Sequence, residues 1–591
     1  MRIHCRFGLL NGWAWFNRWA FFVNQPLVRS IREIVAFVLL ITFSVSLFAA
    51  SPAVVRGSKG VVASRSALAS EVGVEIMKAG GNAFDAAVAV GFALAVTYPS
   101  AGNLGGGGFM LGYTEKGQKF ALDFREKAPA LAHKDMFLDE SGEVVSGLST
   151  KSHLAVGVPG SVAGLLAVLE KYGSLSPQQV IAPAIALAEQ GFALNYDIAR
   201  QFEKKLPAMA HYPASVEKFS NKGESYQAGE IWKQPYLAKT LKRIADQGVA
   251  GFYQGPTADL LVAEMQRGGG IISKQDLRDY EVVWRSPIEG EYRGYQLLGM
   301  PPPSSGGVLV QQILNAIEPY DVRGMKWGSA ELIHLMVEAQ RRAFADRAEH
   351  LGDADFYPVP VQRLIAKSYA RKRFTDFDPQ KASDSEVISP GKTAPQESVE
   401  TTHYSVMDHF GNAVSVTTTL NLGYGNKVVV EGAGFLLNNE MDDFSAKPGT
   451  PNAYGLLGSE ANAIKAGKRM LSSMSPTIVI KEGKPYLVTG SPGGSTIINT
   501  TLQVLVNVID HQMPLNDAVA LPRFHHQWKP NQIKFERYGI SVDAQRKLRA
   551  MKHQELIQLG GTMGDANSVM NSEGVLMGMS DPRNQGGAAA Y

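Results

Sequence analysis

The second half of the chain contains short polar motifs with the side chains that acyl-transfer chemistry uses. In Glu400-Thr401-Thr402, a hydroxyl residue stands where a polar linker meets a strand-like run. A cut in the peptide bond before Thr401 would give this residue a free α-amine beside its own hydroxyl, which places a base and a nucleophile in one residue. Taken alone, however, Thr401-Thr402 is better explained as the start of an edge strand.

Four further motifs downstream of Thr401 carry hydroxyl, carboxylate and glycine residues. They are Thr417-Thr418-Thr419-Leu420-Asn421, Leu437-Asn438-Asn439-Glu440-Met441-Asp442-Asp443-Phe444, Leu471-Ser472-Ser473-Met474-Ser475-Pro476 and Gly490-Ser491-Pro492-Gly493-Gly494-Ser495-Thr496. The last is a glycine-rich turn that opens a helix, where backbone N–H groups can bind an oxyanion. Each motif alone is explained by an ordinary loop, but their order and close spacing are together much more specific.

Arg125 is the candidate cation upstream of these motifs. It follows a short predicted strand over residues 121–124, and its planar fork could clamp a carboxylate. The alternative is a solvated ion pair with Asp123 or Glu126, which is the commoner case in a charged loop.

The sequence lacks the usual signatures of other chemistries. It contains no His-Glu-x-x-His or Cys-x-x-Cys motif, so zinc has no obvious site. The adjacent His525 and His526 would point to opposite faces of a strand, which favours structural histidines over joint ligands. Four glycines at 105–108 are followed by no Lys-Ser/Thr pair, which favours close backbone packing over phosphate binding.

Hydrophobic periodicity and turn residues predict the elements that must position these motifs. Residues 403–407 and 413–417 alternate around Gly411-Asn412, and residues 477–480 and 486–489 alternate around Glu482-Gly483, so each pair predicts a hairpin. Helices are predicted at 85–96, at 176–190 with a capping box, after Ser273, after Ser329 and at 496–509. Helices, then hairpins, then helices favour two sheets packed between helical layers, with both halves of the chain contributing.

Composition bounds the class of protein. The 591 residues are 45% apolar and 19% charged, which allows a sizeable core, and a net charge of +3 without a long basic run argues against nucleic acid as a partner. Arg29 and Arg32 precede an apolar run at residues 34–50, which predicts a secretory signal peptide, with an uncleaved N-terminal anchor as the alternative. The single cysteine, Cys5, lies before that run, so the exported protein would have no disulfide.

The chain resembles the gamma-glutamyltranspeptidases over essentially its whole exported length. The resemblance rests on residues 77–83, the tetraglycine, residues 123–126 and the motifs at 401–405, 438–439, 441–444, 472–476 and 490–494. It implies an α+β fold, the four-layer αββα sandwich of N-terminal-nucleophile hydrolases, built from both halves of a precursor that cuts itself between Glu400 and Thr401. The implied organisation is a signal peptide or anchor at 1–50, a large subunit at 51–400 and a small catalytic subunit at 401–591, with one shared core.

The resemblance also implies a role for each motif. Thr401 would be the nucleophile, Thr419 would orient it, and Gly493 and Gly494 would form the oxyanion hole. The remaining implied roles are in substrate binding: Arg125 with Ser472 and Ser473 for the α-carboxylate of the γ-glutamyl group, Asn421, Glu440 and Asp443 for its α-ammonium, and Tyr454 in a lid loop. No metal or organic cofactor is implied.

The expected activity is that of a glutathione hydrolase and gamma-glutamyl transferase. The acyl group formed on Thr401 from glutathione or another γ-glutamyl compound would pass to water, an amino acid or a dipeptide, with ping-pong kinetics. The two subunits would remain paired, and the expected location is the periplasm, with secretion or N-terminal anchoring as alternatives. The alternative functions are a glutaryl or cephalosporin acylase of the same fold and an exported amino-acid binding protein without catalysis.

Overall fold

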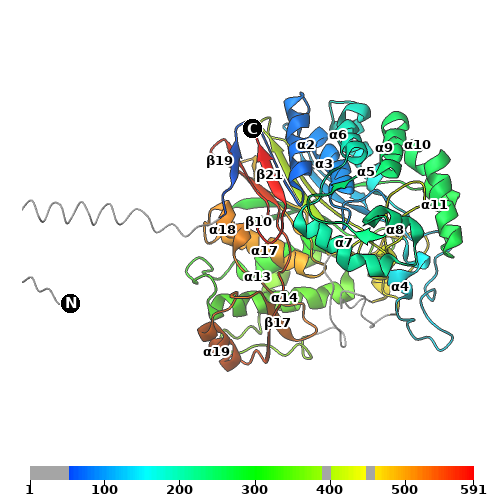
Figure 1. Ribbon diagram of the computed structural model, residues 1–591. Coiled ribbons are helices and arrows are strands. Elements are labelled where there is room, and N and C mark those ends of the chain that lie inside the picture. The colour runs from blue at the N-terminus through cyan, green and yellow to red at the C-terminus, as the bar shows by residue number, and fades with distance from the viewer. Residues whose placement is uncertain (1–51, 389–400, 448–458) are drawn as a thin grey trace, which may run out of the picture. The chain divides into compact units, whose positions relative to one another are not determined.

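Two seven-stranded antiparallel sheets organise the part of the chain that the computed structural model describes, residues 52–388, 401–447 and 459–591 (Figure 1). Strand β12 (Thr402–Asp408) is central to the first sheet and lies between β13 (Ala413–Thr419) and β2 (Gly60–Ser64). The prediction of an edge strand at Thr401-Thr402 is therefore wrong, because β2 arrives from the distant N-terminal part of the chain. Its pairing with β12 begins only at Ser405, three residues into the strand.

The two sheets combine strands from both sides of the Glu400–Thr401 bond. The first runs in the order β21 (Gly587–Ala590), β2, β12, β13, β3 (Gly107–Tyr113), β4 (Lys119–Phe124) and β9 (Val283–Arg285). The second runs in the order β1 (Val55–Gly57), β20 (Val575–Met579), β19 (Ser568–Ser572), β15 (Lys484–Thr489), β14 (Thr477–Lys481), β11 (Tyr295–Gly299) and β10 (Ile288–Tyr292). A cut at that bond would leave each sheet built from two chains, and separating them would expose unpaired strand edges.

Helices cover the outer face of each sheet, which gives four layers. Against the first sheet lie α2 (Ala67–Lys78), α3 (Ala83–Thr97) and α5 (Ser161–Tyr172). On the second sheet lies α13 (Gly306–Ile317), with α14 (Ala330–His350) and α17 (Thr496–Ile509) packed against it. Between the sheets is a separate apolar core that includes Phe109, Leu111, Leu298 and Ile478. The expected αββα arrangement of an α+β protein is thus observed.

Local sequence signals placed the hairpins and helices well. The two predicted hairpins are β12–β13 and β14–β15, and α3 is buried along its whole length as its unbroken apolar run requires. Capping boxes begin α6 (Pro177–Gln190) at Ser176 and α12 (Lys274–Arg278) at Ser273. These predictions succeeded because a cap or a two-residue period is a property of neighbouring residues.

Smaller elements complete the chain. Between α6 and β9 they are β5 (Phe192–Ala193), α7 (Tyr196–Met209), α8 (Pro213–Phe219), β6 (Ser220–Asn221), β7 (Glu224–Ser225), β8 (Ile231–Trp232), α9 (Pro235–Gln247), α10 (Ala250–Tyr253), α11 (Gly255–Arg267) and α12. Later ones include α15 (Val361–Leu364), α16 (Lys367–Arg373), α18 (Leu515–Ala520), β16 (Phe524–His525), β17 (Gln532–Phe535), α19 (Val542–Ala550) and β18 (Glu555–Gln558). Within the described ranges, no helix combines the length and apolarity needed to cross a membrane.

Candidate functional site

A single cavity gathers most of the residues that the sequence nominated. Its lining includes Arg125, Thr401, Thr419, Asn421, Glu440, Asp443, Ser472, Ser473 and Gly494. Gly493 precedes the lining residue Gly494 in the same turn, and Tyr454 lies outside the described residues. The cavity also has three lining residues that the sequence analysis did not nominate, Arg347, Met474 and Ile497.

The hairpin β12–β13 brings Thr401 and Thr419 together. Thr402 is paired with Thr418, so the residues on either side of this pair, Thr401 and Thr419, are also neighbours. The Thr401 Oγ1 donates to Thr419 Oγ1 over 3.5 Å, and the backbone N–H of Asn421 donates to the same Thr419 oxygen over 2.8 Å. Both threonines are buried. Thr419 is therefore fixed by the main chain and can orient the Thr401 hydroxyl.

The tetraglycine lies directly behind Thr419. A Cβ atom on Gly106 would overlap the carbonyl oxygen of Thr419, and one on Gly108 would overlap that of Thr417. Asn103 closes this contact by donating from Nδ2 to the Thr419 carbonyl over 2.9 Å. The glycines thus allow the close backbone approach that the sequence predicted, and this approach sets the position of β13.

Arg125 is completely buried and faces carboxyl groups from a distant part of the chain. Its Nη1 donates to Glu440 and its Nη2 to Asp443, while the Glu126 carboxylate lies 3.6 Å from Nη1. The predicted solvated pair with Asp123 or Glu126 is wrong in its setting, because Arg125 is fully buried. Asp123 instead accepts from the Arg125 backbone N–H over 3.0 Å. Glu440 and Asp443 belong to one 3₁₀ turn, Glu440–Asp443, which presents both carboxyls to the same guanidinium.

The protonation of this cluster reflects three buried carboxyls around one cation. Burial raises the pKa of Glu126 to about 7 and raises the pKa of Glu440 and of Asp443, while Arg125 acts in the opposite direction on all three. Burial lowers the pKa of Arg125, but the surrounding carboxylates raise it by more, so Arg125 stays charged. Three carboxyl groups beside one fixed cation can bind a ligand that carries both charges, because a cationic ligand would favour their ionised forms.

Ser472 and Ser473 are held by a buried arginine that the sequence analysis missed. Arg347 donates from Nε to Ser305 Oγ over 3.0 Å and from Nη2 to Ser473 Oγ over 3.3 Å. Ser305 in turn donates from its hydroxyl to the carbonyl of Ser472 over 2.7 Å. Arg347 is in the last turn of α14, and no local signal distinguishes it from the other charged residues of that helix. The contact between Arg347 and Ser473 depends on the packing of α14 beside the loop that carries Ser472 and Ser473.

Gly493 and Gly494 form the turn that leads into α17. Their φ angles are 132° and 55°, which are readily adopted by glycine and strained for other residues. The N–H of Thr496 donates to the Gly493 carbonyl over 3.0 Å, so the helix starts immediately after the turn. Gly494 and Ile497 both line the cavity, which puts the N-terminal end of α17 at its wall. Helix N-termini stabilise negative charge.

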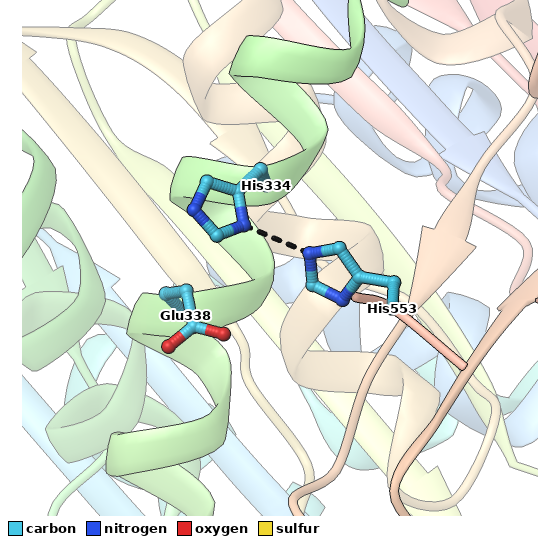
Figure 2. Close-up of side chains that lie close together, drawn as sticks. All are labelled: His334, Glu338 and His553. Carbon is cyan, nitrogen blue, oxygen red and sulfur yellow. Dashed lines mark hydrogen bonds between the residues drawn. The ribbon is translucent and has the colours of Figure 1, made fainter. Parts of the chain in front are cut away.

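One cluster in the described part of the chain has the residue types of a metal site, although the sequence motifs predicted no such site. His334 and Glu338 are one turn apart on α14 and meet His553 (Figure 2). His334 Nε2 must donate to the carbonyl of Asp378, 2.8 Å away, so its Nδ1 accepts from His553 Nε2 over 2.8 Å. Burial raises the pKa of Glu338, but the neighbouring Arg341 and Arg342 lower it by a larger amount. The pKa of Glu338 is therefore lowered to about 2. His334 and Glu338 therefore already have hydrogen-bond partners within the protein.

The adjacent histidines have separate structural partners, as predicted. His525 Nε2 lies 2.8 Å from Gln527 Oε1, whereas His526 Nδ1 accepts from the backbone N–H of Trp528 over 3.0 Å.

Buried neutral histidines predict acid sensitivity. Burial lowers the pKa of His403, His525 and His553 to about 3, whereas an unfolded histidine titrates near 6.5. The unfolded chain therefore binds more protons between these values, and each such histidine removes about 2 kcal/mol of stability as the pH falls from 6.5 to 5. For His553, the nearby charged or titratable groups are His334, Glu338 and Arg341.

We expect the unfolding temperature of His553→Gln to fall less between pH 7.5 and 5 than that of the wild type. Replacement of the exposed His409 by Gln is the matched control and should keep the wild-type pH dependence. Equal pH dependence in His553→Gln and the wild type would contradict the prediction.

The chain is similar to known proteins over nearly all of the described length. Residues 69–591 match the sequence profile of the family described as Gamma-glutamyltranspeptidase. The "Glutathione hydrolase proenzyme" of Escherichia coli (strain K12) is 51% identical over 531 residues, which cover 90% of this chain and 91% of that protein. A crystal structure of cephalosporin acylase from Bacillus halodurans has a TM-score of 0.80 at 27% identity and covers 92% of this chain and 98% of the acylase. A chain of Helicobacter pylori gamma-glutamyltranspeptidase, 49% identical, has a TM-score of 0.54 and covers 55% of this chain and 93% of its own length.

Proposed function

The chain belongs to the gamma-glutamyltranspeptidase family, and from this premise we propose that it is a glutathione hydrolase and gamma-glutamyl transferase. Its precursor cuts itself between Glu400 and Thr401 in this proposal, and the name "Glutathione hydrolase proenzyme" of two relatives supports processing of a precursor. The observation that carries the proposal is the shared cavity of Thr401 and the Arg125 cluster. The nucleophile and the charged side chains that can bind a small zwitterion therefore line the same cavity.

Thr401 is the nucleophile that forms the acyl-enzyme, and it is the leaving group when water or an acceptor amine attacks that acyl-enzyme. After the cut, its α-amine has an ordinary pKa of about 7.7–8.0, so the neutral amine can accept the hydroxyl proton. The Oγ–C bond forms at the γ-carbonyl carbon, the C–N bond breaks, and the proton leaves with the amine product. Thr419 orients the hydroxyl, and the backbone N–H groups of Gly493 and Gly494 stabilise the oxyanion at the start of α17.

Opposite charges in the cavity select the γ-glutamyl group. Its α-carboxylate binds Arg125 with help from the Ser472 and Ser473 hydroxyls. Its α-ammonium binds Glu440 and Asp443, which already face the same side of Arg125, with Asn421 beside them. The last substrate-binding residue of the proposal is Tyr454, in a lid loop over the pocket.

The products of the cut, the acceptors and the location are the further parts of the proposal. The subunits 51–400 and 401–591 stay together as a heterodimer, which is supported by the strands that each of them contributes to both sheets. Water, amino acids or dipeptides take the γ-glutamyl group from the acyl-enzyme. Export to the periplasm rests on the arginines and apolar run of residues 29–50, with cleavage or retention of that segment as the two outcomes.

The acylase alternative fits the cavity less well. A glutaryl group lacks the α-ammonium, so it would bring no positive charge for Glu440 and Asp443 to bind. The binding-protein alternative would need neither Thr401 nor Thr419, yet the two hydroxyls are in contact. The greater identity to a glutathione hydrolase proenzyme, 51% against 36% for an "Acylase ACY 1 proenzyme" of Pseudomonas sp. (strain V22), also favours the γ-glutamyl substrate.

Asp443→Asn tests the selection of the α-ammonium. We expect the wild type to hydrolyse γ-glutamyl-p-nitroanilide at least about 100-fold faster than glutaryl-p-nitroanilide, in kcat/KM. The neutral amide should reduce that ratio by roughly 10-fold or more, because a charge-assisted hydrogen bond contributes about 1.5–3 kcal/mol. The matched control is Asp543→Asn on the exposed helix α19. A wild-type preference for the glutaryl anilide would identify an acylase, and an unchanged ratio in Asp443→Asn would exclude the assigned role.

A further inference from the structure

Thr401 borders a second cavity, whose lining does not include Arg125. This cavity is lined by Arg65, Tyr98, Pro492, Asp565 and Arg583 among others, and its lining shares only Thr401 with the first cavity among the described residues. Pro492 lines the second cavity and Gly494 lines the first. The turn of residues 492–494 therefore lies between the two cavities. The nucleophile is thus placed between two chemically different spaces.

The chemistry of acyl transfer requires such a second space. Once the γ-glutamyl group occupies the Arg125 cavity, the amine that it loses must leave from the other side of the acyl carbon. Attack by an acceptor amine is the reverse of that departure, so both amines pass through the same position. The leaving amine of glutathione is a dipeptide with a carboxylate at its far end, and amino-acid and dipeptide acceptors share that feature.

Arg65 offers a fixed cation to this cavity. It directly follows β2, donates from Nη1 to Asp565 Oδ2 over 2.7 Å and lies 5.3 Å from the centre of the Tyr98 ring. Its side chain is 19% exposed, so the guanidinium can be reached from the cavity. A guanidinium has five N–H donors in a planar fork, and the bond to Asp565 fixes the direction of that fork.

Asp565 and Arg583 form the framework around this cation. Asp565 is buried; its backbone N–H donates to Ser491 Oγ over 2.8 Å, and its side chain accepts from Asn567 as well as Arg65. Burial raises the pKa of Asp565 to about 6, and Arg65 opposes that effect. Arg583 donates to Glu536 and to the carbonyl of Leu521, which commits it to the surrounding loops.

We propose that this second cavity is the subsite for the amine partner, and that Arg65 binds the carboxylate of the leaving or accepting amino acid or dipeptide. The inference rests on the proposed γ-glutamyl transfer. It adds to that proposal the place of the amine partner and the residue that recognises its carboxylate.

The test compares acceptors that differ only in this carboxylate. γ-Glutamyl-p-nitroanilide is the donor because its leaving group has no carboxylate, and glycylglycine and glycylglycinamide are the acceptors. We measure kcat/KM for formation of each γ-glutamyl product and take the ratio of the two acceptors, which cancels any difference in the amount of active enzyme. The variants are Arg65→Gln and Arg65→Lys, and the control is Arg56→Gln at an exposed arginine of β1.

We expect the wild type and Arg56→Gln to favour glycylglycine by roughly 10- to 100-fold, as a lost charge-assisted hydrogen bond implies. The ratio should fall to near one in Arg65→Gln and remain partly elevated in Arg65→Lys. A wild-type ratio near one, or an Arg65→Gln ratio equal to that of the wild type, overturns the inference while the γ-glutamyl activity stands. Absence of any p-nitroaniline release by the processed wild type would instead overturn the proposed function, and this inference with it.

Discussion

Thr401→Ala should produce a single uncut chain with γ-glutamyl activity reduced on the order of 10⁶-fold, the scale seen when a nucleophile is deleted from a catalytic unit. The same hydroxyl is assigned to the cut before Thr401 and to attack on the substrate, so its removal abolishes both. The hydroxyl of Thr419 cannot replace that of Thr401 as the nucleophile, because Thr419 only orients Thr401. A denaturing gel and intact mass report the cut, and γ-glutamyl-p-nitroanilide reports the activity.

The neighbouring Thr402 supplies the matched control. Its Oγ1 is buried and has no hydrogen-bond partner among the described residues, so Thr402→Ala removes a hydroxyl of the same type, one residue away, at little cost. We expect Thr402→Ala to be cut and active, and Thr401→Ser to be cut because it retains a hydroxyl. A processed and active Thr401→Ala protein would rule out Thr401 as the nucleophile.

Arg125→Gln should lower kcat/KM for γ-glutamyl-p-nitroanilide by at least about 100-fold and the free energy of unfolding by about 3–5 kcal/mol. The first effect follows from loss of the partner for the α-carboxylate, and the second from leaving three buried carboxyls without their cation. Kinetics and thermal unfolding of the processed protein measure the two effects separately.

The stability loss in Arg125→Gln should grow as the pH rises from about 5 to 8. Burial already raises the pKa of Glu126 to about 7, and without Arg125 this pKa rises further above its unfolded value of about 4.5. Near and above pH 7 the folded variant then binds more protons than the folded wild type, so its stability falls more steeply with increasing pH. A deficit that is largest at pH 5 would contradict this account.

Arg125→Lys separates charge from geometry. It keeps the cation but loses the fork that faces Glu440 and Asp443, so it should recover much of the stability and little of the activity. Wild-type kcat/KM in Arg125→Gln would remove Arg125 from the proposed site.

The sequence alone identified the chemistry of this chain through short motifs whose constraints are local. The Ser176 and Ser273 capping boxes depend on neighbouring residues, and the β12–β13 hairpin depends on its turn and its alternation. The motifs also carried a resemblance to the gamma-glutamyltranspeptidases, which the family match confirms. The register of that hairpin, which places Thr401 beside Thr419, was seen only in the structure.

Tertiary structure alone decided which groups those motifs meet. Arg125 and Glu440 are 315 positions apart, and their contact exists because β4 and the Glu440–Asp443 turn are brought together in one folded unit. The central position of β12 depends on β2, the support of Ser473 by Arg347 depends on α14, and the placement of Arg65 depends on Asp565, 500 positions away. Such pairs have no sequence period or spacing, because they are set by the packing of layers rather than by the local backbone.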